Sequence, residues 1–358
     1  MRTTVASPTF LSSPSKPHTP DWSRALGRPS ARAIVRSSVD DFVVEEDLGF
    51  EPSGDGEHLF LFVEKHNRTT DEVAARLARI AGVPRRAVSF SGLKDKRART
   101  RQWFSVQCVP RREVDWPAAI DENIVIVERS LNRRKLRRGA HRANRFTLVL
   151  REVHDPEDTL QRRLESLARS GAPNYFGEQR FGRGGGNVGI AERVFAGSRV
   201  SRRERSIALS AARSLIFNDV LARRIEDGSW TALQVGDVAN LNGRDSVFAV
   251  AEVDAELETR CQQLDVHPTG PLWGKGAPGS SGDIETLERS VAAQHLSLVT
   301  GLEANTDVSR RPLRVRLDAL EWHADADRLT LTFSLRRGSF ATAVLRELIT
   351  PIAEPGRS

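Results

Sequence analysis

The return of a strand pattern at the end of the chain most constrains the fold. Strand-forming segments occur between residues 33 and 152, and they return from Leu313 onward in "RVRLDALEW" and "RLTLTFSLR". The middle of the chain instead has long helical patterns near 187–197 and 203–227. Strands on both sides of a helical middle are typical of one α+β domain that contains an insertion.

The composition changes after Gly171, where "GAPNYFGEQRFGRGGGN" is rich in loop residues. Residues 1–32 are rich in Ser, Thr, Pro and Arg and contain one acid, Asp21, which favours a disordered extension. We therefore predict an extension over 1–32, the first part of the main domain over 33–169, an inserted domain over 170–313, and the rest of the main domain over 314–358.

The net charge of +7 and the isoelectric point of about 10.0 favour a polyanionic partner. Only 6 of the 54 basic residues are Lys, however, and a GC-rich coding sequence would produce such an excess of Arg. Local clusters of basic residues are therefore better evidence for a polyanionic partner than the total charge is. Cys108 and Cys261 lie far apart and have no zinc or disulfide spacing, and no apolar stretch is long enough to span a membrane. We expect a metal-free cytoplasmic protein.

A basic cluster without any acid lies between Arg129 and Arg145. We call its central part the basic strip; its residues are Arg133, Arg134, Lys135, Arg137 and Arg138. A codon bias explains Arg in place of Lys, but it does not explain the absence of Asp and Glu. The strip is interpreted as a phosphate-binding surface, with a solvated loop as the alternative.

A single carboxylate stands in a basic stretch, "SFSGLKDKRARTRQWFSV" (89–106). Asp95 has Lys94, Lys96, Arg97, Arg99 and Arg101 as its charged neighbours. The stretch is either a solvated turn or a site in which basic neighbours such as Lys94 keep a carboxylate ionised for an anionic substrate.

Other catalytic and cofactor patterns are weak. No His is evidently paired with a Ser or Cys, and no zinc deaminase signature occurs. The glycines at 184, 186 and 189 match G-x-G-x-x-G, but the preceding "NYFGEQRF" does not read as a buried strand. We therefore expect a loop that enters a helix near Gly189, and no bound dinucleotide.

Five stretches together resemble the TruD family of tRNA pseudouridine synthases, and they occur in the family's order. They are "DDFVVEEDLGFEPSGDGEH" (40–58), "VSFSGLKDKRARTRQWF" (88–104), "HRANRFTLVLRE" (141–152), "PNYFGEQRFGRGG" (173–185) and "GSFATAVLREL" (338–348). The resemblance implies an α+β catalytic domain with a mainly antiparallel mixed sheet, and an inserted α/β domain named TRUD. It also implies isomerisation of uridine 13 in tRNA to pseudouridine, without metal or cofactor.

The resemblance also implies the site residues. The family's catalytic aspartate falls on Asp95, and residues that line its nucleotide site fall on Phe42, Asn144 and Phe340. Arg36 matches a basic position that is usually Lys in the family. We add Lys94, beside Asp95, to the substrate-binding set, and we expect a monomer without an obligate protein partner.

Some alternatives stay open. Asp95 can serve as a nucleophile or as a base toward the sugar C2′ proton. Phe340, Val344 and Leu348 have the spacing of a helical core stripe, so Phe340 is either a site residue or a core residue. The rival function is a non-catalytic RNA-binding or RNA-chaperone protein that uses the same basic surface. An acid inside G-L-K-D favours the enzyme, because phosphate binding gains nothing from it.

Overall fold

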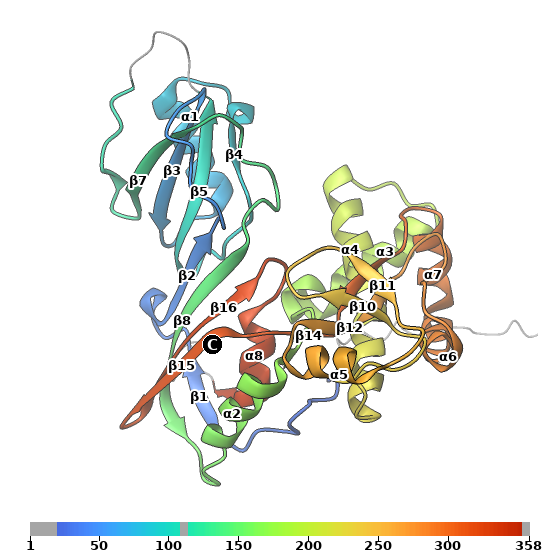
Figure 1. The fold of residues 1–358 in the computed structure, drawn as a ribbon. Helices are drawn as coiled ribbons and strands as arrows, with labels where there is room; N and C mark the ends of the chain where they lie inside the picture. Colours follow the sequence, from blue (N-terminus) through green and yellow to red (C-terminus); the bar gives the residue numbers. More distant parts are fainter. Residues whose placement is uncertain (1–19, 108–113, 353–358) are drawn as a thin grey trace, which may run out of the picture.

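The computed structural model describes residues 20–107 and 114–352 (Figure 1). Most of the predicted extension (1–19) and Cys108 lie outside these ranges. No helix within them is long and apolar enough to cross a membrane.

In the described ranges, an eleven-stranded sheet forms the main body, in the order β15-β16-β8-β2-β5-β3-β7-β6. Outside this path, β1 pairs with β8 and β17, and β4 pairs with β5. The strands are β1 (Arg32–Val35), β2 (Phe42–Asp47), β3 (His58–Lys65), β4 (Val88–Phe90), β5 (Arg99–Gln107), β6 (Ala119–Asp121), β7 (Ile124–Asn132), β8 (Ala143–His154), β15 (Asp318–Asp325), β16 (Arg328–Arg336) and β17 (Thr350–Ile352).

The longest strand of this sheet, β8, joins the two ends of the chain. It runs antiparallel to β16, from Leu329 opposite Leu150 to Arg336 opposite Ala143, and it also pairs antiparallel with β2 and β1. The pairs β2–β5 and β1–β17 are parallel, so the sheet is mixed but mainly antiparallel. The predicted α+β class is confirmed.

Three helices cover this sheet, and each has an apolar face. The helix α1 (Thr70–Ala81) begins at a capping box of Thr69 and Glu72 and packs on β3, β4, β5 and β7 in the upper part of Figure 1. The helices α2 (Leu160–Ser170) and α8 (Ala341–Leu348) pack on the other end, against β1, β2, β8 and β16. Short 3₁₀ turns occur at η1 (Val39–Asp41) and η2 (Arg85–Ala87).

The chain leaves and re-enters this body at one place. Strand β9 (Ala172–Pro173) pairs antiparallel with β14 (Arg314–Val315), which sets the two ends of the intervening segment side by side. We therefore keep 170–313 as the proposed inserted domain. To the right of the main body in Figure 1, this segment forms its own four-stranded sheet in the order β11-β10-β12-β13.

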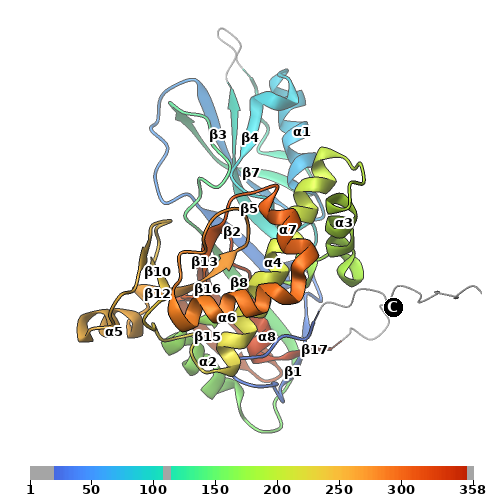
Figure 2. The same cartoon turned by 90° about the vertical axis from the view of Figure 1, so that its right-hand side faces the viewer.

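The strands of the inserted segment are β10 (Val238–Leu241), β11 (Val247–Ala249), β12 (Val266–Leu272) and β13 (Ser309–Pro312). Its helices and 3₁₀ turns are η3 (Glu178–Arg180), η4 (Arg183–Gly185), α3 (Gly186–Phe195), α4 (Arg202–Glu226), α5 (Ala255–Gln262), α6 (Gly282–Ala292), η5 (Ala293–His295) and α7 (Leu296–Glu303). The long helix α4 packs against α3, α6, α7 and β12, as Figure 2 shows from the side. The glycine run enters α3 at Gly186, slightly earlier than predicted.

Residues 20–32 differ from the predicted disordered extension. Trp22 is 9% exposed and packs against Tyr175 and Phe181. Its indole Nε1 donates to Asp219 on α4 at 2.5 Å, while Arg346 on α8 donates to its main-chain oxygen. An isolated aromatic residue in a Ser- and Pro-rich stretch has no periodic pattern, so the sequence did not reveal this packing.

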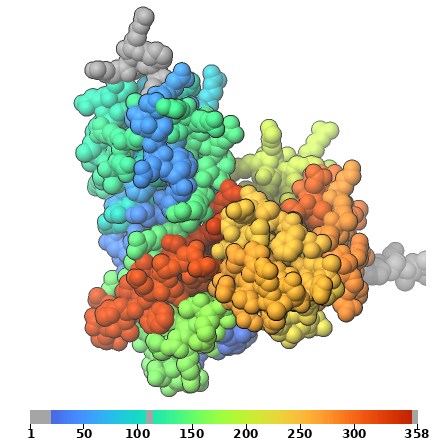
Figure 3. All heavy atoms as spheres, in the orientation of Figure 1, coloured from blue at the N-terminus to red at the C-terminus, as the bar shows by residue number. Residues whose placement is uncertain are grey.

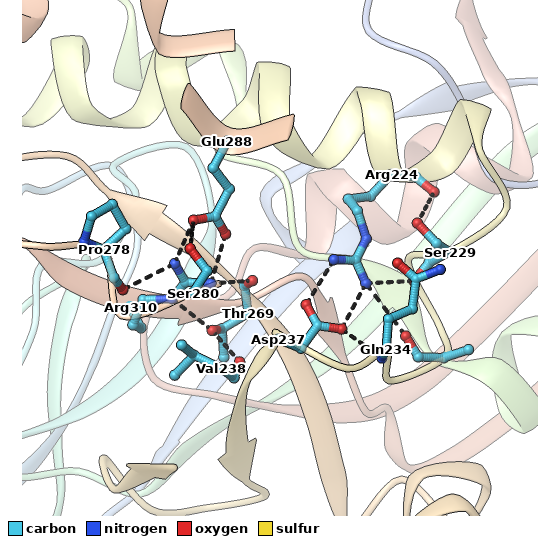
Figure 4. Close-up of polar contacts among 11 residues, drawn as sticks. Arg224, Ser229, Gln234, Asp237, Val238, Thr269, Pro278, Ser280, Glu288 and Arg310 are labelled. Carbon is cyan, nitrogen blue, oxygen red and sulfur yellow. Dashed lines mark hydrogen bonds and ion pairs between the residues drawn. The ribbon is translucent and has the colours of Figure 1, made fainter. Parts of the chain in front are cut away.

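Two buried ion pairs stabilise the inserted segment (Figure 4). Arg224 on α4 forms a two-pronged pair with Asp237, at 2.7 and 3.0 Å, and both side chains are almost completely buried. Arg310 on β13 forms the same kind of pair with Glu288 on α6, at 2.8 and 2.9 Å. Burying a charge this deeply is costly unless the charge is paired, so each partner depends strongly on the other.

We expect Asp237→Ala to destabilise the protein by about 3–5 kcal/mol, because it leaves the buried Arg224 guanidinium unpaired. Asp55→Asn is the matched control, since it breaks the fully exposed Arg133–Asp55 pair and should leave the melting temperature nearly unchanged. Thermal unfolding followed by circular dichroism measures both variants. Equal melting temperatures for Asp237→Ala and the unmutated protein would contradict the role of the buried pair.

Candidate active site

Asp95 lies in the loop between β4 and β5, and its side chain is 39% exposed. A carboxylate oxygen accepts a hydrogen bond from the Arg36 guanidinium at 2.9 Å. Arg36 follows β1 with a left-handed φ of 63°, which is uncommon for a residue other than glycine. Its guanidinium also lies 3.8 Å from the centre of the Phe42 ring. The structure therefore brings three of the predicted site residues into contact.

The sequence neighbours of Asp95 have other partners. Lys94 bonds Glu46 at 2.6 Å in a buried pair, Arg99 pairs with Asp40 and Glu64, and Arg101 pairs with Glu45 and Glu64. The ion-pair partner of Asp95 is Arg36, which lies 59 positions away in the chain. The expectation that Lys94 and Arg99 or Arg101 keep Asp95 ionised has no direct ion pair to support it, because each of these residues is bonded to another acid.

Three buried polar side chains hold the backbone of the loop. Gln102 on β5 donates to the main-chain oxygen of Gly92 at 3.0 Å, and the main-chain N–H of Lys94 donates to Thr70 on α1 at 3.0 Å. The ammonium of Lys65, at the end of β3, donates to the main-chain oxygen of Asp95 at 2.6 Å. None of these three supporting residues was predicted from the sequence, since polar residues in strands are usually read as solvent-facing.

His141 contacts this loop directly, because its Nδ1 and its main-chain N–H both bond the Ser91 hydroxyl, at 2.6 and 2.8 Å. Asn144 stands opposite Glu46 in the β2–β8 register, and Glu46 is the residue that binds Lys94. The Asn144 Nδ2 lies 3.4 Å from His141 Nε2, while Asn144 Oδ1 is buried and has no hydrogen-bond partner in the described ranges. Burial and the Lys94 charge lower the pKa of His141 to about 4, so its ring is neutral at pH 7.

Phe340 lies at the N-cap of α8 and is partly buried. Its ring packs on the cluster that contains Phe176, whose ring centre lies 6.1 Å away. Val344 and Leu348 belong instead to the core beneath the main sheet. Helical spacing therefore does not place Phe340 in the same core as these two residues. Its proposed place in the site has no direct contact with Asp95 to support it.

A cavity of about 850 Å³ separates the end of β16 from the inserted segment. Eight arginines and one acid, Asp245, line it, together with His141 and Ser339. Arg336 projects against Gly243 and has no ion pair within the described part of the chain. Figure 3 shows a hollow in the surface between the upper part of the main body, in blue and green, and the inserted segment, in yellow and orange. A cavity with this excess of positive charge suits an anionic ligand.

The basic strip lies on the connection from β7 to β8, close to the loop that contains Asp95. The main-chain N–H of Gly139, just after the strip, donates to the main-chain oxygen of Ser91 at 2.9 Å. Arg133 pairs with Asp55, Lys135 donates to the Arg86 main-chain oxygen, and Arg138 lies over the Phe90 ring at 3.9 Å. The five residues are exposed; they are Arg133, Arg134, Lys135, Arg137 and Arg138.

No group of three or more His, Cys, Asp and Glu side chains that could hold a metal ion occurs among residues 20–107 and 114–352. Operation without metal or cofactor stays a prediction.

An accessible carboxylate bonded by an arginine, together with a cavity lined by eight arginines, is typical of a protein that acts on an anionic substrate. A model of the family described as tRNA pseudouridine synthase D (TruD) matches residues 25–194 and 191–348. The tRNA pseudouridine synthase D of Methylococcus capsulatus is 44% identical over 340 residues, which cover 94% of this chain and 96% of the relative. That of Pseudomonas syringae pv. syringae is 46% identical over 330 residues, covering 91% and 94%.

The chain therefore belongs to the TruD family of tRNA pseudouridine synthases. The family predicted from the motifs is confirmed, and so is the prediction that the protein is an isomerase. A crystal structure from Methanosarcina mazei, whose protein carries the TruD name, is similar with a TM-score of 0.67 and covers 93% of this chain and 95% of that one. At 22% identity, this likeness supports the fold alone.

Acid should destabilise the protein through His141. Its pKa is about 4 when folded against an ordinary value of 6.5, so between these values only the unfolded chain takes up the proton. Stability should fall by roughly 1–3 kcal/mol as the pH drops through this window, with no contribution above it. The melting temperature of His141→Gln should fall less than that of the unmutated protein between about pH 7 and pH 4.5. If the melting temperatures of the variant and the unmutated protein fell equally over this range, the sensitivity to acid would come from groups other than His141.

Proposed function

We propose that the protein converts uridine 13 of tRNA to pseudouridine, and that Asp95 is the reacting carboxylate, without metal or cofactor. Membership of the TruD family supports pseudouridine formation in tRNA. The position of Asp95 is the main support for its proposed role. Its carboxylate is accessible and bonded by Arg36, and buried side chains hold its loop in place. A functional group that is rigidly held and accessible is the arrangement that catalysis requires.

The reaction breaks the bond from C1′ to N1, turns the uracil and joins C1′ to C5. C5 then loses its proton and N1 takes one up, so the product is an isomer of the substrate. Asp95 can attack as a nucleophile or remove the sugar C2′ proton, and both roles need an ionised carboxylate that reaches the ribose. Arg36 serves either role, because its guanidinium stabilises the negative charge on Asp95 and orients one oxygen.

The uridine must leave the tRNA stack to reach Asp95, which costs a few kcal/mol. The unpaired Oδ1 of Asn144 is suited to accept the N3–H of uracil, because a buried acceptor without a partner gains most from a new donor. Phe42 is buried beneath Arg36, so we propose that the Arg36 plane, and not the Phe42 ring, faces the base. Phe340 stays a proposed aromatic wall, and Lys94 is proposed to act through Glu46.

The arginine-lined cavity and the basic strip are the proposed contacts for the tRNA backbone. Two of the arginines that line the cavity, Arg244 and Arg336, have no carboxylate partner and no side-chain hydrogen bond in the described structure. Arg311 and Arg314 are instead already bonded to protein acceptors. Guanidinium groups without an acid nearby can bind phosphates without first breaking an ion pair. A monomer in the cytoplasm is the proposed form and location of the protein.

Asp95→Asn should abolish pseudouridine formation and leave tRNA binding within a few-fold. The amide has almost the same shape, but it lacks the charge that attack or proton removal requires. The test is chemical mapping of pseudouridine in a uridine-13 tRNA, together with a filter-binding titration. The same assay on a tRNA with cytidine at position 13 is the control for the site. Substantial turnover by Asp95→Asn, or modification at another position, would contradict the proposal.

Replacing Arg134 and Arg137 with Gln should weaken tRNA binding and flatten its salt dependence. Their side chains have no partner in the described ranges, so each lost phosphate contact should lower the log–log slope by roughly 0.7–0.9. Arg133→Gln is the matched control and should change the slope less, because Asp55 already neutralises Arg133. An unchanged slope for the Arg134 and Arg137 variant would identify the strip as a solvated surface.

A further inference from the structure

One positively charged side chain is unusually deeply buried. It lies beneath the loop that contains Asp95, which we call the catalytic loop. Lys65 ends β3 with a relative exposure of 0%, in the strand whose other inward residues form the core under α1. Its ammonium makes one hydrogen bond within the described structure, to the main-chain oxygen of Asp95 at 2.6 Å. No carboxylate lies within ion-pair distance of it in these ranges. A buried ammonium with a single neutral acceptor is destabilising, so packing alone does not explain it.

The charges that face Lys65 come from two elements. The catalytic loop contributes Asp95, which favours the charged ammonium, and Lys94, which opposes it, while α1 contributes Glu72, which favours it. The strands on either side of Lys65 place neutral residues opposite it, Thr100 on β5 and Ile124 on β7. Of the two acids, Asp95 has the larger effect on Lys65, so the buried ammonium is electrostatically coupled to this residue.

We propose that Lys65 is a positioning residue for the reaction: its ammonium fixes the peptide of Asp95 from below and places a positive charge under the carboxylate that reacts. This inference rests on the proposed role of Asp95. Arg36 holds the carboxylate from the exposed side, and Lys65 holds the backbone from the buried side. Asp95 thus has a cation on each side, and only one of them is accessible to the substrate.

The same contact makes the rate depend on pH. Burial lowers the pKa of Lys65 to about 8 from its ordinary value of 10.5. Below this pH the ammonium is charged and donates to the Asp95 carbonyl, whereas above it the charge is lost. The single-turnover rate should therefore fall as the pH rises through about 8. An arginine at this position stays charged and should keep the rate to higher pH.

The test uses the full-length protein with Lys65→Met, Lys65→Arg and a control, Val106→Ala. Methionine has a similar length without the charge, so Lys65→Met should fold at least as stably as the unmutated protein. Its kcat should fall roughly 10–100-fold with KM within about twofold, because the misplaced loop affects the reaction and not tRNA binding. Val106 is buried in the same core, so Val106→Ala should lower the melting temperature and leave kcat per folded molecule near normal.

Three results would overturn the proposal. They are a normal kcat for Lys65→Met, an equal loss of kcat in Val106→Ala, or a rate for the unmutated protein that does not fall above about pH 8. The last measurement needs no variant, so it decides the matter even if Lys65→Met fails to fold. An inactive Asp95→Asn with an active Lys65→Met would reject Lys65 alone, whereas an active Asp95→Asn would reject the proposed function itself.

Discussion

The pairing of β8 with β16 is the constraint on which the rest of the structure depends. It joins two segments separated by the whole inserted region, and it sets Ala143 and Asn144 opposite Arg336 and Leu335. The other edge of β8 pairs with β2, so Phe42 and Glu46 are placed by the same strand. One strand therefore fixes the positions of the amide, the aromatic ring and the Glu46–Lys94 pair. A register shift of one residue would turn all of them to the opposite face.

The loop that contains Asp95 has no regular structure of its own, and its neighbours hold it in place. Side chains from three elements bind successive backbone groups of the loop: Gln102 from β5, Thr70 from α1 and Lys65 from β3. Thr70 also donates to Gln102 at 2.9 Å, so two of these supports are linked to each other. Sites held by strands and helices are more precise than sites held by loops alone. Here the loop receives that precision through buried hydrogen bonds.

Much of this arrangement could be predicted from the sequence, because periodicity reports local structure. The alternation of Phe146, Leu148 and Leu150 predicts the strand β8, and an apolar face predicts a helix from Thr70 with Thr70 or Asp71 as its cap. The structure has that helix as α1, but its cap is Thr69. Partners far apart in the chain could not be predicted from spacing. Asp95 has five basic neighbours in sequence, yet its ion-pair partner is Arg36, because the strands determine which charges meet. Lys65 was missed for a related reason: a sequence pattern does not show whether a charged residue at a strand end is buried.

The order in which the chain is made bears on the packing of its two ends. Strand β1 pairs with β17, and Trp22 lies between Asp219 and Arg346. Arg346 and β17 are made late, whereas Asp219 and the other partner of β1, strand β8, are made earlier. The N-terminal segment therefore has part of its binding surface early and completes its packing only after residues 346–352 have been made. A nascent chain in that state exposes unpaired strand edges and an indole ring, which are surfaces that chaperones bind. A chain cut near residue 340 would lack both β17 and Arg346 and would leave these surfaces of the N-terminal segment uncovered.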